Sequence, residues 1–412
     1  MQAVARSARC SATRRPLGRS TRGRGRGSAC RAGLAADAGE AVQSTHHEPL
    51  GEDGEGLYSR ATKGCFDVIG NAWDLVSAAI DAAPAPAPGC PFVIADFGTA
   101  DGGTSMPLLH RAIGRVRERF PGVEVEVRYE DQPFNEWRSL FFHTQGTVAI
   151  PDVPVYWRDY DGVFVTASGL TFAEQCFPSG SVHLAVSFTA MHWLSELPCT
   201  VEGAVHSTQA SPEEKAKFQA QAAADWERIL RHRAAELAPG GAAVLVNFTE
   251  SPEGWRLGGT DEGANMYDLF ASLWKRLEES GRITHEEFVR CTFPNHYRTE
   301  EEIRAPFAPG GVAAASGLEL ASVETRVVRC PFRTEYRRAG GDPVQYAADY
   351  VPTLRTWSNS TFLNALDDAR PLAEREAIVE EFFASYRAEV AADPAAHGMD
   401  YVHSYSYIRK QA

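Results

Sequence analysis

The chain has 412 residues, 44% of them hydrophobic, and its 41 Lys and Arg residues against 54 Asp and Glu residues give a formal net charge of −13. This length and apolar content suit one large or two modest domains with a buried core, and they argue against a disordered or coiled-coil protein. No apolar run approaches the roughly 20 residues that a membrane-spanning helix needs, so we expect no membrane partner. The eight Cys residues include no CxxC pair, which argues against a disulfide framework and a zinc site.

Basic residues are concentrated at the N-terminus. Residues 1–36 hold nine Arg and no acidic residue, and the rest of the chain carries a net charge of −22. An Arg-, Ser- and Ala-rich, acid-free N-terminus is typical of an organelle transit peptide, so we expect a chloroplast or other organelle location after its removal, and a cytoplasmic one otherwise. The alternative is a basic nucleic-acid arm. The acidic remainder would repel a polyphosphate, and we expect no nucleic-acid partner for it. Residues 37–56 are small and polar and predict a flexible lead-in.

The pattern of the next 200 residues alternates between helix and strand. Apolar side chains recur every three or four residues over 58–83, which predicts a helix that ends at APAPAPG (83–89). A short apolar strand, a Gly-rich turn and an amphipathic helix follow. Strand and helix patterns then repeat to about residue 250. This alternation predicts an α/β fold with a doubly wound, mostly parallel, Rossmann-like sheet. The predicted strands cover 90–96, 123–129, 163–165, 183–187 and 242–248, and the helices between them include 108–116, 134–142 and 223–237.

Beyond residue 250 the predicted helices no longer alternate regularly with strands. Helical periodicity covers 265–279 and 372–390, whereas 317–329 and 401–409 alternate as strands do. We therefore divide this part into segments of an α-helical cap and returning strands of the sheet. The predicted division is an α/β core over 57–250, cap segments over 251–316 and 331–395, and core strands within 317–330 and 396–412.

The Gly-rich turn after the first strand is a candidate nucleotide site, because backbone N–H groups and a helix N-terminus meet there. Its spacing, Gly98-x-x-x-Gly102-Gly103 with Ala100 inside, is not the G-x-G-x-x-G of a dinucleotide site, and it lacks the Lys of a P-loop. Asp96 and Asp101 suit a cationic amino-acid group. Asp131, at the end of the second strand, suits the hydroxyls of a ribose. S-adenosylmethionine combines these parts, although Asp96 as a plain helix cap is the alternative.

Four motifs in order identify a family resemblance: IADFGTADGGTS (94–105), YEDQPFNEWRSLF (129–141), LTFAEQCFP (170–178) and SFTAMHWLSELP (187–198). They resemble the IADLGCSSGPNT, LNDLPxNDFNxxF, GSFYxxLFP and SxxxLHWLSxxP motifs of the SABATH family of carboxyl methyltransferases. The resemblance extends over about residues 57–409. It implies a methyltransferase sheet with a helical cap, S-adenosyl-L-methionine as the cofactor and a small carboxylic acid as the substrate. Many members of this family are homodimers, so the resemblance allows a homodimer here.

The resemblance also implies roles for individual residues. In the family the indole N–H of the Trp that matches Trp193 holds the substrate carboxylate, and His192 is its neighbour. Either His296 or Tyr297 is expected to face the substrate. The residues that match cofactor-binding positions are Tyr58, Thr62, Asp96, Gly98, Asp131, Thr171 and Phe172. Those that match substrate-binding positions are Cys65, Met191, His192, Trp193, Met266 and Tyr267.

Two departures from the family pattern qualify this interpretation. The family Gln that binds the carboxylate together with the Trp falls on Cys65. Either the carboxylate is bound incompletely here, or another donor replaces the Gln amide. A magnesium site found in plant relatives falls on Cys291–Pro294, which lacks the polar ligands, and we expect no metal.

A carboxylate acceptor is ionised at neutral pH, so no general base is needed and the protein's task is positioning. The alternatives are N-methylation of a purine-like heterocycle and a catalytically silent cofactor-binding protein.

Overall fold

The computed structural model describes residues 54–412. The expected transit peptide over 1–36 lies outside the described residues, as does most of the lead-in over 37–56. The last residues of that lead-in are packed. Gly54 and Gly56 are buried, both with positive φ, and a Cβ at Gly56 would lie 2.1 Å from His143 Nε2 of helix α5 (Trp137–Thr144). Glycine at 56 therefore lets the chain approach α5 closely.

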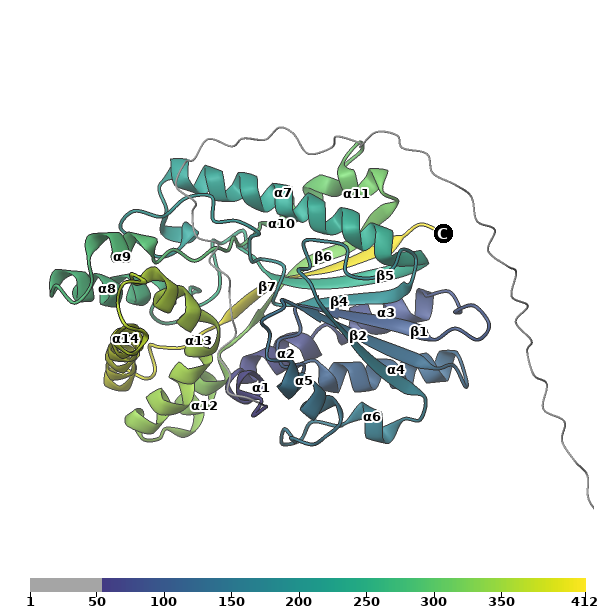
Figure 1. The fold of residues 1–412 in the computed structure, drawn as a ribbon, viewed down its shortest axis with the longest axis horizontal. Coiled ribbons are helices and arrows are strands. Elements are labelled where there is room, and N and C mark those ends of the chain that lie inside the picture. Colours follow the sequence, from purple (N-terminus) through teal and green to yellow (C-terminus); the bar gives the residue numbers. More distant parts are fainter. Residues whose placement is uncertain (1–53) are drawn as a thin grey trace, which may run out of the picture. The chain divides into compact units, whose positions relative to one another are not determined.

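One seven-stranded sheet forms the centre of the described chain, in the order β3-β2-β1-β4-β5-β7-β6 (Figure 1). Neighbouring strands among β1 to β5 pair in parallel, whereas β7 lies antiparallel between β5 and β6. This sheet confirms the predicted mostly parallel, Rossmann-like fold. The strands are β1 (Phe92–Phe97), β2 (Val125–Asp131), β3 (Val163–Gly169), β4 (Val182–Phe188), β5 (Leu237–Phe248), β6 (Leu318–Val328) and β7 (Tyr401–Lys410).

Helices cover both faces of the sheet because its strands are apolar on both sides. In β1, Phe92 and Ile94 pack with α3 (Trp73–Ala82) and α4 (Met106–Arg119), while Val93 and Ala95 pack with α7 (Pro212–Glu236) on the other face. Figure 1 shows α7 on one side of the sheet and α3 and α4 on the other. Shorter helices at the edges of the sheet are α6 (Tyr156–Asp159), α10 (Glu300–Arg304) and α11 (Val312–Ala315), and two 3₁₀ turns cover Ser207–Gln209 and Ala305–Phe307.

The helical cap gathers beyond the carboxyl ends of the parallel strands (Figure 1). Its centre is aromatic, with the rings of Phe362 and Phe382 4.1 Å apart and those of Phe270 and Phe362 5.3 Å apart. Such clusters exclude water from the adjoining region. The cap helices are α8 (Met266–Glu279), α9 (His285–Arg290), α12 (Pro331–Ala339), α13 (Pro343–Ala365) and α14 (Leu372–Ala392). None of the helices in the described range 54–412 is long and apolar enough to cross a membrane.

The single helix predicted over 58–83 is wrong, because that segment forms three helices: α1 (Leu57–Ala61), α2 (Lys63–Gly70) and α3. The first break is at Thr62, whose hydroxyl donates to the carbonyl oxygen of Tyr58 over 2.7 Å and whose φ of −96° and ψ of 57° are not helical. A local side-chain bond of this kind competes with helix continuation. The break turns α1 and α2 so that both contribute side chains to one cavity, described below.

Candidate active site

The turn after β1 passes closely beneath the loop that follows β4. Gly98 has a φ of +70°, and a Cβ there would lie 2.1 Å from the Cβ of Ala190. The N–H of Ala100 donates to Asp131 Oδ2 over 2.7 Å, which ties the turn to the end of β2. Only glycine fits at position 98, because of both its φ and the close contact. The turn lies where the strand order reverses between β1 and β4, which is where open α/β sheets bind ligands.

Two carboxylates lie at the carboxyl ends of neighbouring strands beside this turn. Asp96, 2% exposed, accepts a hydrogen bond from Ser105 Oγ over 2.7 Å, and burial raises its pKa to about 7. Asp131 accepts from the N–H groups of Ala100 and Gln132, both over 2.7 Å, and burial raises its pKa to about 6. Asp131 is half-buried, so solvent screens it more than Asp96. Both carboxyls would be stabilised in the ionised form by a cationic or hydrogen-bond-donating ligand.

Asp101 has a structural role in this turn. It accepts hydrogen bonds from the N–H (2.9 Å) and the hydroxyl of Ser59, and His143 Nε2 lies 3.8 Å from it. These contacts anchor α1 against the Gly-rich turn. Of the two turn carboxylates considered for a cationic ligand, Asp96 is therefore the better placed.

Sequence reasoning missed Glu130, which is fully buried next to Asp131 in β2. Its Oε2 accepts the N–H of Gly98 over 3.2 Å, and burial raises its pKa well above the usual range. Successive side chains of a strand point to opposite faces, so Glu130 and Asp131 hold the same turn from two sides. The adjacent acidic pair in the sequence was the signal for this arrangement.

Thr171 and Phe172 follow β3 at the same edge of the sheet. Thr171 is exposed and its Oγ1 accepts the N–H of Ala173 over 3.3 Å. Phe172 packs partly buried against the cluster that contains Phe97, and its carbonyl oxygen accepts from Arg233 Nη1 over 2.7 Å. They lie outside the cavity described next, and their expected contact with an adenine stays a prediction.

A cavity of about 440 Å³, partly open to solvent, lies at the carboxyl ends of β4 and β5. Its wall is largely aromatic and apolar, with a few hydroxyl, amide and imidazole groups. Ala190, which packs on Gly98, directly follows the cavity residue Thr189, so the cavity adjoins the Gly-rich turn. The lining residues are Tyr58, Thr62, Cys65, Thr189, His192, Trp193, Phe248, Leu257, Asn295, Tyr297, Trp357, Met399 and Tyr401.

Five of the residues expected from the sequence meet at this cavity. Tyr58, Thr62 and Cys65 reach it from α1 and α2, and His192 and Trp193 from the loop after β4. The imidazole of His192 lies 5.5 Å from the Trp193 ring and 4.7 Å from Phe248, between ring centroids. Tyr58 and Thr62, expected at the cofactor, thus share a wall with Cys65, His192 and Trp193, expected at the substrate.

The other three expected substrate residues do not line the cavity. Met191 points to the opposite face of the sheet into the cluster with Phe97. Met266 and Tyr267 lie one layer behind the wall, where the Tyr267 hydroxyl contacts that of the lining residue Tyr297 at 2.5 Å. Their contact with a substrate stays a prediction.

Tyr297, and not His296, is the residue of that pair that lines the cavity. His296 Nε2 lies 3.1 Å from Glu302 Oε2 at the start of α10, which directs it away from the lining.

Cys65 is a buried thiol rather than an activated nucleophile. Burial raises its pKa to about 11, despite side-chain hydrogen bonds with Thr62, Tyr58 and Tyr401. Because the thiolate is the reactive form, this cysteine is inert at neutral pH.

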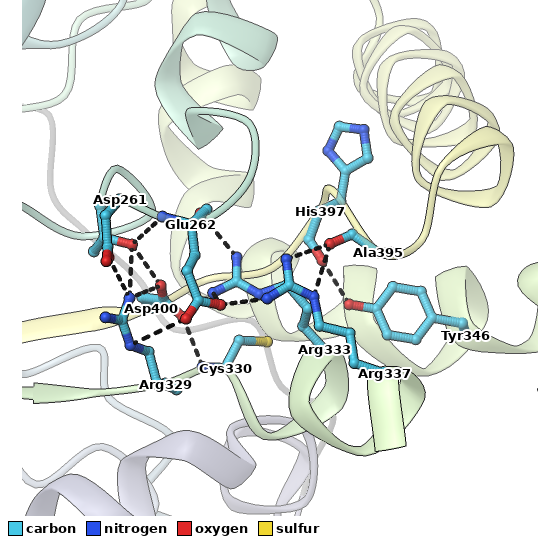
Figure 2. Close-up of polar contacts among 11 residues, drawn as sticks. Asp261, Glu262, Arg329, Cys330, Arg333, Arg337, Tyr346, Ala395, His397 and Asp400 are labelled. Carbon is cyan, nitrogen blue, oxygen red and sulfur yellow. Dashed lines mark hydrogen bonds and ion pairs between the residues drawn. The ribbon is translucent and has the colours of Figure 1, made fainter. Parts of the chain in front are cut away.

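An ion network surrounds Asp400, as Figure 2 shows. It fixes the part of the wall formed by Met399 and Tyr401. Asp400, between them in sequence, is 1% exposed and bonds Arg333 at 2.5 Å and Arg329 at 3.0 Å. Although burial disfavours its ionised form, hydrogen bonds from Arg333 and Thr260 lower the pKa of Asp400. The network joins α12 and the loop before α8 to the start of β7, and so holds the cap against the sheet.

Several lining residues were not expected from the sequence, notably Thr189, Asn295, Phe248 and Trp357. Thr189 has a φ of +62°, which is rare for a β-branched residue and typical of functional sites. No sequence pattern predicts that conformation. Asn295 lies in the loop between α9 and α10. The only indication of its role in the sequence was that it directly precedes His296 and Tyr297.

Comparison with known proteins identifies the family. Residues 51–411 match the family described as SAM-dependent carboxyl methyltransferase. The chain belongs to this family. Its sequence is 29% identical over 275 residues to O-methyltransferase acrG of Aspergillus aculeatus, covering 65% of this chain and 69% of that protein. It is 24% identical over 276 residues to gibberellic acid methyltransferase 1 of Arabidopsis thaliana, covering 62% and 70%.

The fold of this carboxyl methyltransferase is also that of a solved relative. The structure of loganic acid methyltransferase with SAH gives a TM-score of 0.67 at 20% identity, covering 88% of this chain and 99% of that one. Both the family and the fold agree with the resemblance drawn from the four motifs. The chain is thus an S-adenosylmethionine-dependent methyltransferase.

The residues at the Gly-rich turn fit this cofactor. Asp96 and Asp131 are carboxyls whose raised pKa values indicate an unmet demand for positive charge or hydrogen-bond donors. An ammonium group and ribose hydroxyls meet that demand. Within residues 54–412, no group of three or more His, Cys, Asp or Glu side chains is placed to hold a metal ion.

Proposed function

We propose that this methyltransferase forms the methyl ester of a small, largely apolar carboxylic acid that binds in the cavity. The observation that carries the proposal is the position of the cavity, which adjoins the Gly-rich turn and combines aromatic walls with a few polar groups. Pockets of that composition bind small organic ligands through apolar contact and use the polar groups for orientation. Two relatives are named for their action on gibberellic acid and loganic acid, which are carboxylic acids.

The chain contributes to the reaction by positioning the cofactor and the acid. A carboxylic acid with a pKa of about 4 is ionised at neutral pH, so no residue must remove a proton. When bound, S-adenosylmethionine supplies a methyl group on a sulfonium, which leaves as a neutral thioether. Asp96 and Asp131 would hold the cofactor at the turn. The aromatic wall excludes water, and Trp193 would orient the carboxylate beside the turn.

The test is incubation of the purified protein with methyl-labelled cofactor and salicylic, jasmonic, gibberellic, loganic and indole-acetic acids. We expect a base-labile methyl ester from at least one acid. Trp193→Phe should lower kcat/KM about 10- to 100-fold through loss of one oriented donor. Trp157→Phe, which alters a half-exposed Trp on α6, is the matched control and should retain full activity.

Two results would contradict the proposal. A base-stable product with a purine-like heterocycle and no ester from any acid would indicate N-methylation. Tight binding of S-adenosylhomocysteine without turnover of any acid would indicate a silent cofactor-binding protein.

We also propose that residues 1–36 direct the chain to an organelle, on the basis of their nine Arg residues and absence of acidic ones. Fusion of these residues to a fluorescent protein should give organelle fluorescence, and diffuse cytoplasmic fluorescence would refute the assignment.

A further inference from the structure

Two buried histidines lie behind the cavity wall and control the hydrogen bonding of two lining residues. His206 is fully buried behind Asn295, and His403 is fully buried behind Thr189. Burial lowers the pKa of each imidazole to about 3, so both rings are neutral near pH 7. Each neutral ring has one N–H donor and one acceptor nitrogen, so its tautomer decides what it offers to the wall.

The tautomer of His206 follows from its neighbours. Its Nδ1 accepts the backbone N–H of Thr208 over 3.1 Å, so the ring proton is on Nε2. Nε2 lies 2.6 Å from Asn295 Oδ1 and must donate to it. This bond fixes the orientation of the Asn295 amide, with its oxygen occupied by His206 and its NH₂ group turned elsewhere.

The NH₂ group of Asn295 therefore carries the hydrogen-bonding capacity that remains. One N–H serves Tyr267, whose side chain is hydrogen-bonded to that of Asn295. An amide has two N–H donors, and Asn295 lines the cavity while being 1% exposed. The second N–H is left for a ligand in the cavity.

The same reasoning applies to Thr189. His403 Nε2 lies 3.1 Å from Thr189 Oγ1, and within the described part of the chain His403 Nδ1 is buried with no hydrogen-bond partner. A buried N–H without a partner is rarer in proteins than a buried acceptor without one, so the proton is on Nε2. His403 then donates to the Thr189 hydroxyl oxygen. The strained backbone of Thr189 places the residue at the cavity, where its hydroxyl remains available to donate a hydrogen bond to a ligand.

We propose that the N–H of Asn295 and the O–H of Thr189 hold the acceptor carboxylate, and that His206 and His403 are positioning residues that make these two groups donors. This inference rests on the proposed function and names the donors that replace an amide at position 65. A carboxylate only accepts hydrogen bonds, so a wall that presents donors selects it. A ligand that presents N–H groups at the same place puts its own donors against the donors of the wall, so neither side can form a hydrogen bond.

Trp193 is a further donor to this carboxylate in the proposed function, but the polar groups at and beside position 65 are less suited to the task. The hydroxyl of Thr62 already donates to the carbonyl oxygen of Tyr58. Cys65 offers a thiol, which is a weak donor. Asn295 and Thr189 come from different loops, after α9 and after β4, so two independent elements would converge on one carboxylate.

The test compares an acid with its primary amide, which has the same shape but carries N–H donors. Dissociation constants of benzoate and benzamide are measured by ligand-observed NMR with saturating S-adenosylhomocysteine. The native protein should bind benzoate at least tenfold more tightly than benzamide. Asn295→Asp, nearly the same shape with an acceptor in place of the NH₂ group, should lower this ratio at least tenfold. Thr189→Val keeps the branched shape and should lower it about threefold to tenfold, and Thr189→Ser should restore it.

The controls make the same chemical changes elsewhere. Asn359→Asp on α13 and Thr166→Val on β3 lie outside the cavity lining and should leave the ratio unchanged. The selectivity ratio separates a donor role from a structural one, since general loosening weakens both ligands alike. Thr189→Val provides the test if Asn295→Asp disturbs folding.

The inference is overturned if the native protein does not prefer benzoate, or if both cavity variants keep the native ratio within twofold. Failure of the proposed function is a separate result. A shifted ratio without turnover of any acid would refute the function alone, whereas turnover with unshifted ratios would refute this inference alone.

Discussion

Binding of the cofactor should depend on pH through Asp96. In the ligand-free protein burial holds the pKa of Asp96 at about 7, and that of the more screened Asp131 at about 6. In the proposed complex the ammonium group of S-adenosylhomocysteine lies beside Asp96, so it should favour the ionised carboxylate and lower the pKa of Asp96. Protons must therefore leave on binding, and affinity must rise with pH.

The size of the effect follows from the two pKa values. With a pKa of about 7, the protonated fraction of Asp96 weakens the apparent Kd about 11-fold at pH 6 and about 1.1-fold at pH 8. Asp131 adds about a factor of two at pH 6. The Kd should thus be about 10- to 20-fold weaker at pH 6 than at pH 8.

Isothermal titration calorimetry in buffers of different ionisation enthalpy measures both the Kd and the number of protons released. At pH 7 we expect release of about half a proton from Asp96 on binding. Asp96→Asn should bind more weakly at every pH and lose most of the slope, while Asp131→Asn should retain most of it. A native Kd constant within twofold from pH 6 to 8, or an Asp96→Asn variant that keeps the slope, would refute this reasoning.

Three further predictions concern the frame of the site. Gly98→Ala places a Cβ 2.1 Å from that of Ala190 at a positive φ, so S-adenosylhomocysteine binding by calorimetry should weaken at least about 30-fold, and native affinity would disprove the contact. Asp400→Asn removes the shorter of the two ion pairs of the buried Arg333, leaving the pair with Glu262 at 3.4 Å, and should cost about 3 kcal/mol in urea unfolding, whereas Glu335→Gln, at an exposed pair, should change nothing. His206 and His403 have pKa values lowered to about 3, so the stability that their neutral forms contribute is complete above pH 6.5 and falls by about 1.4 kcal/mol per pH unit for each ring as pH drops. The raised pKa values of Asp96 and Asp131 change stability in the opposite direction over the same range, so the measurement is NMR of the imidazoles: both rings should stay neutral from pH 7 to 5, and a ring that protonates in this range would refute the assignment.

The sequence was sufficient for the parallel part of the sheet, because β1 and β4 are short, largely apolar runs and β2 alternates apolar and polar residues before it ends at Glu130 and Asp131. The cap was harder. Helix α13 was not predicted individually, since it contains Pro352 and several Ser and Thr residues and its pattern depends on packing between α1 and α14. The break at Thr62 likewise depends on one side-chain hydrogen bond that periodicity cannot register.

The residues of the candidate site also differ in how far the sequence could predict them. Asp96 and Asp131 could be predicted because the sheet fixes where strand ends meet, whereas His192 was expected only from the family resemblance. Met191 illustrates the limit, since it adjoins His192 in sequence but points to the opposite face of the sheet. Asn295 and Thr189 depend on loop conformation and on histidines distant in sequence, which no local pattern encodes.

The position of β7 has a consequence for synthesis of the chain. β7 lies between β5 and β6, both of which leave the ribosome before it. The β6 strand cannot pair with the sheet until β7 has been made, and Tyr401 completes the cavity wall at the same moment. The nascent chain can therefore form the Gly-rich turn early, but the cavity wall is completed only after β7 has been made.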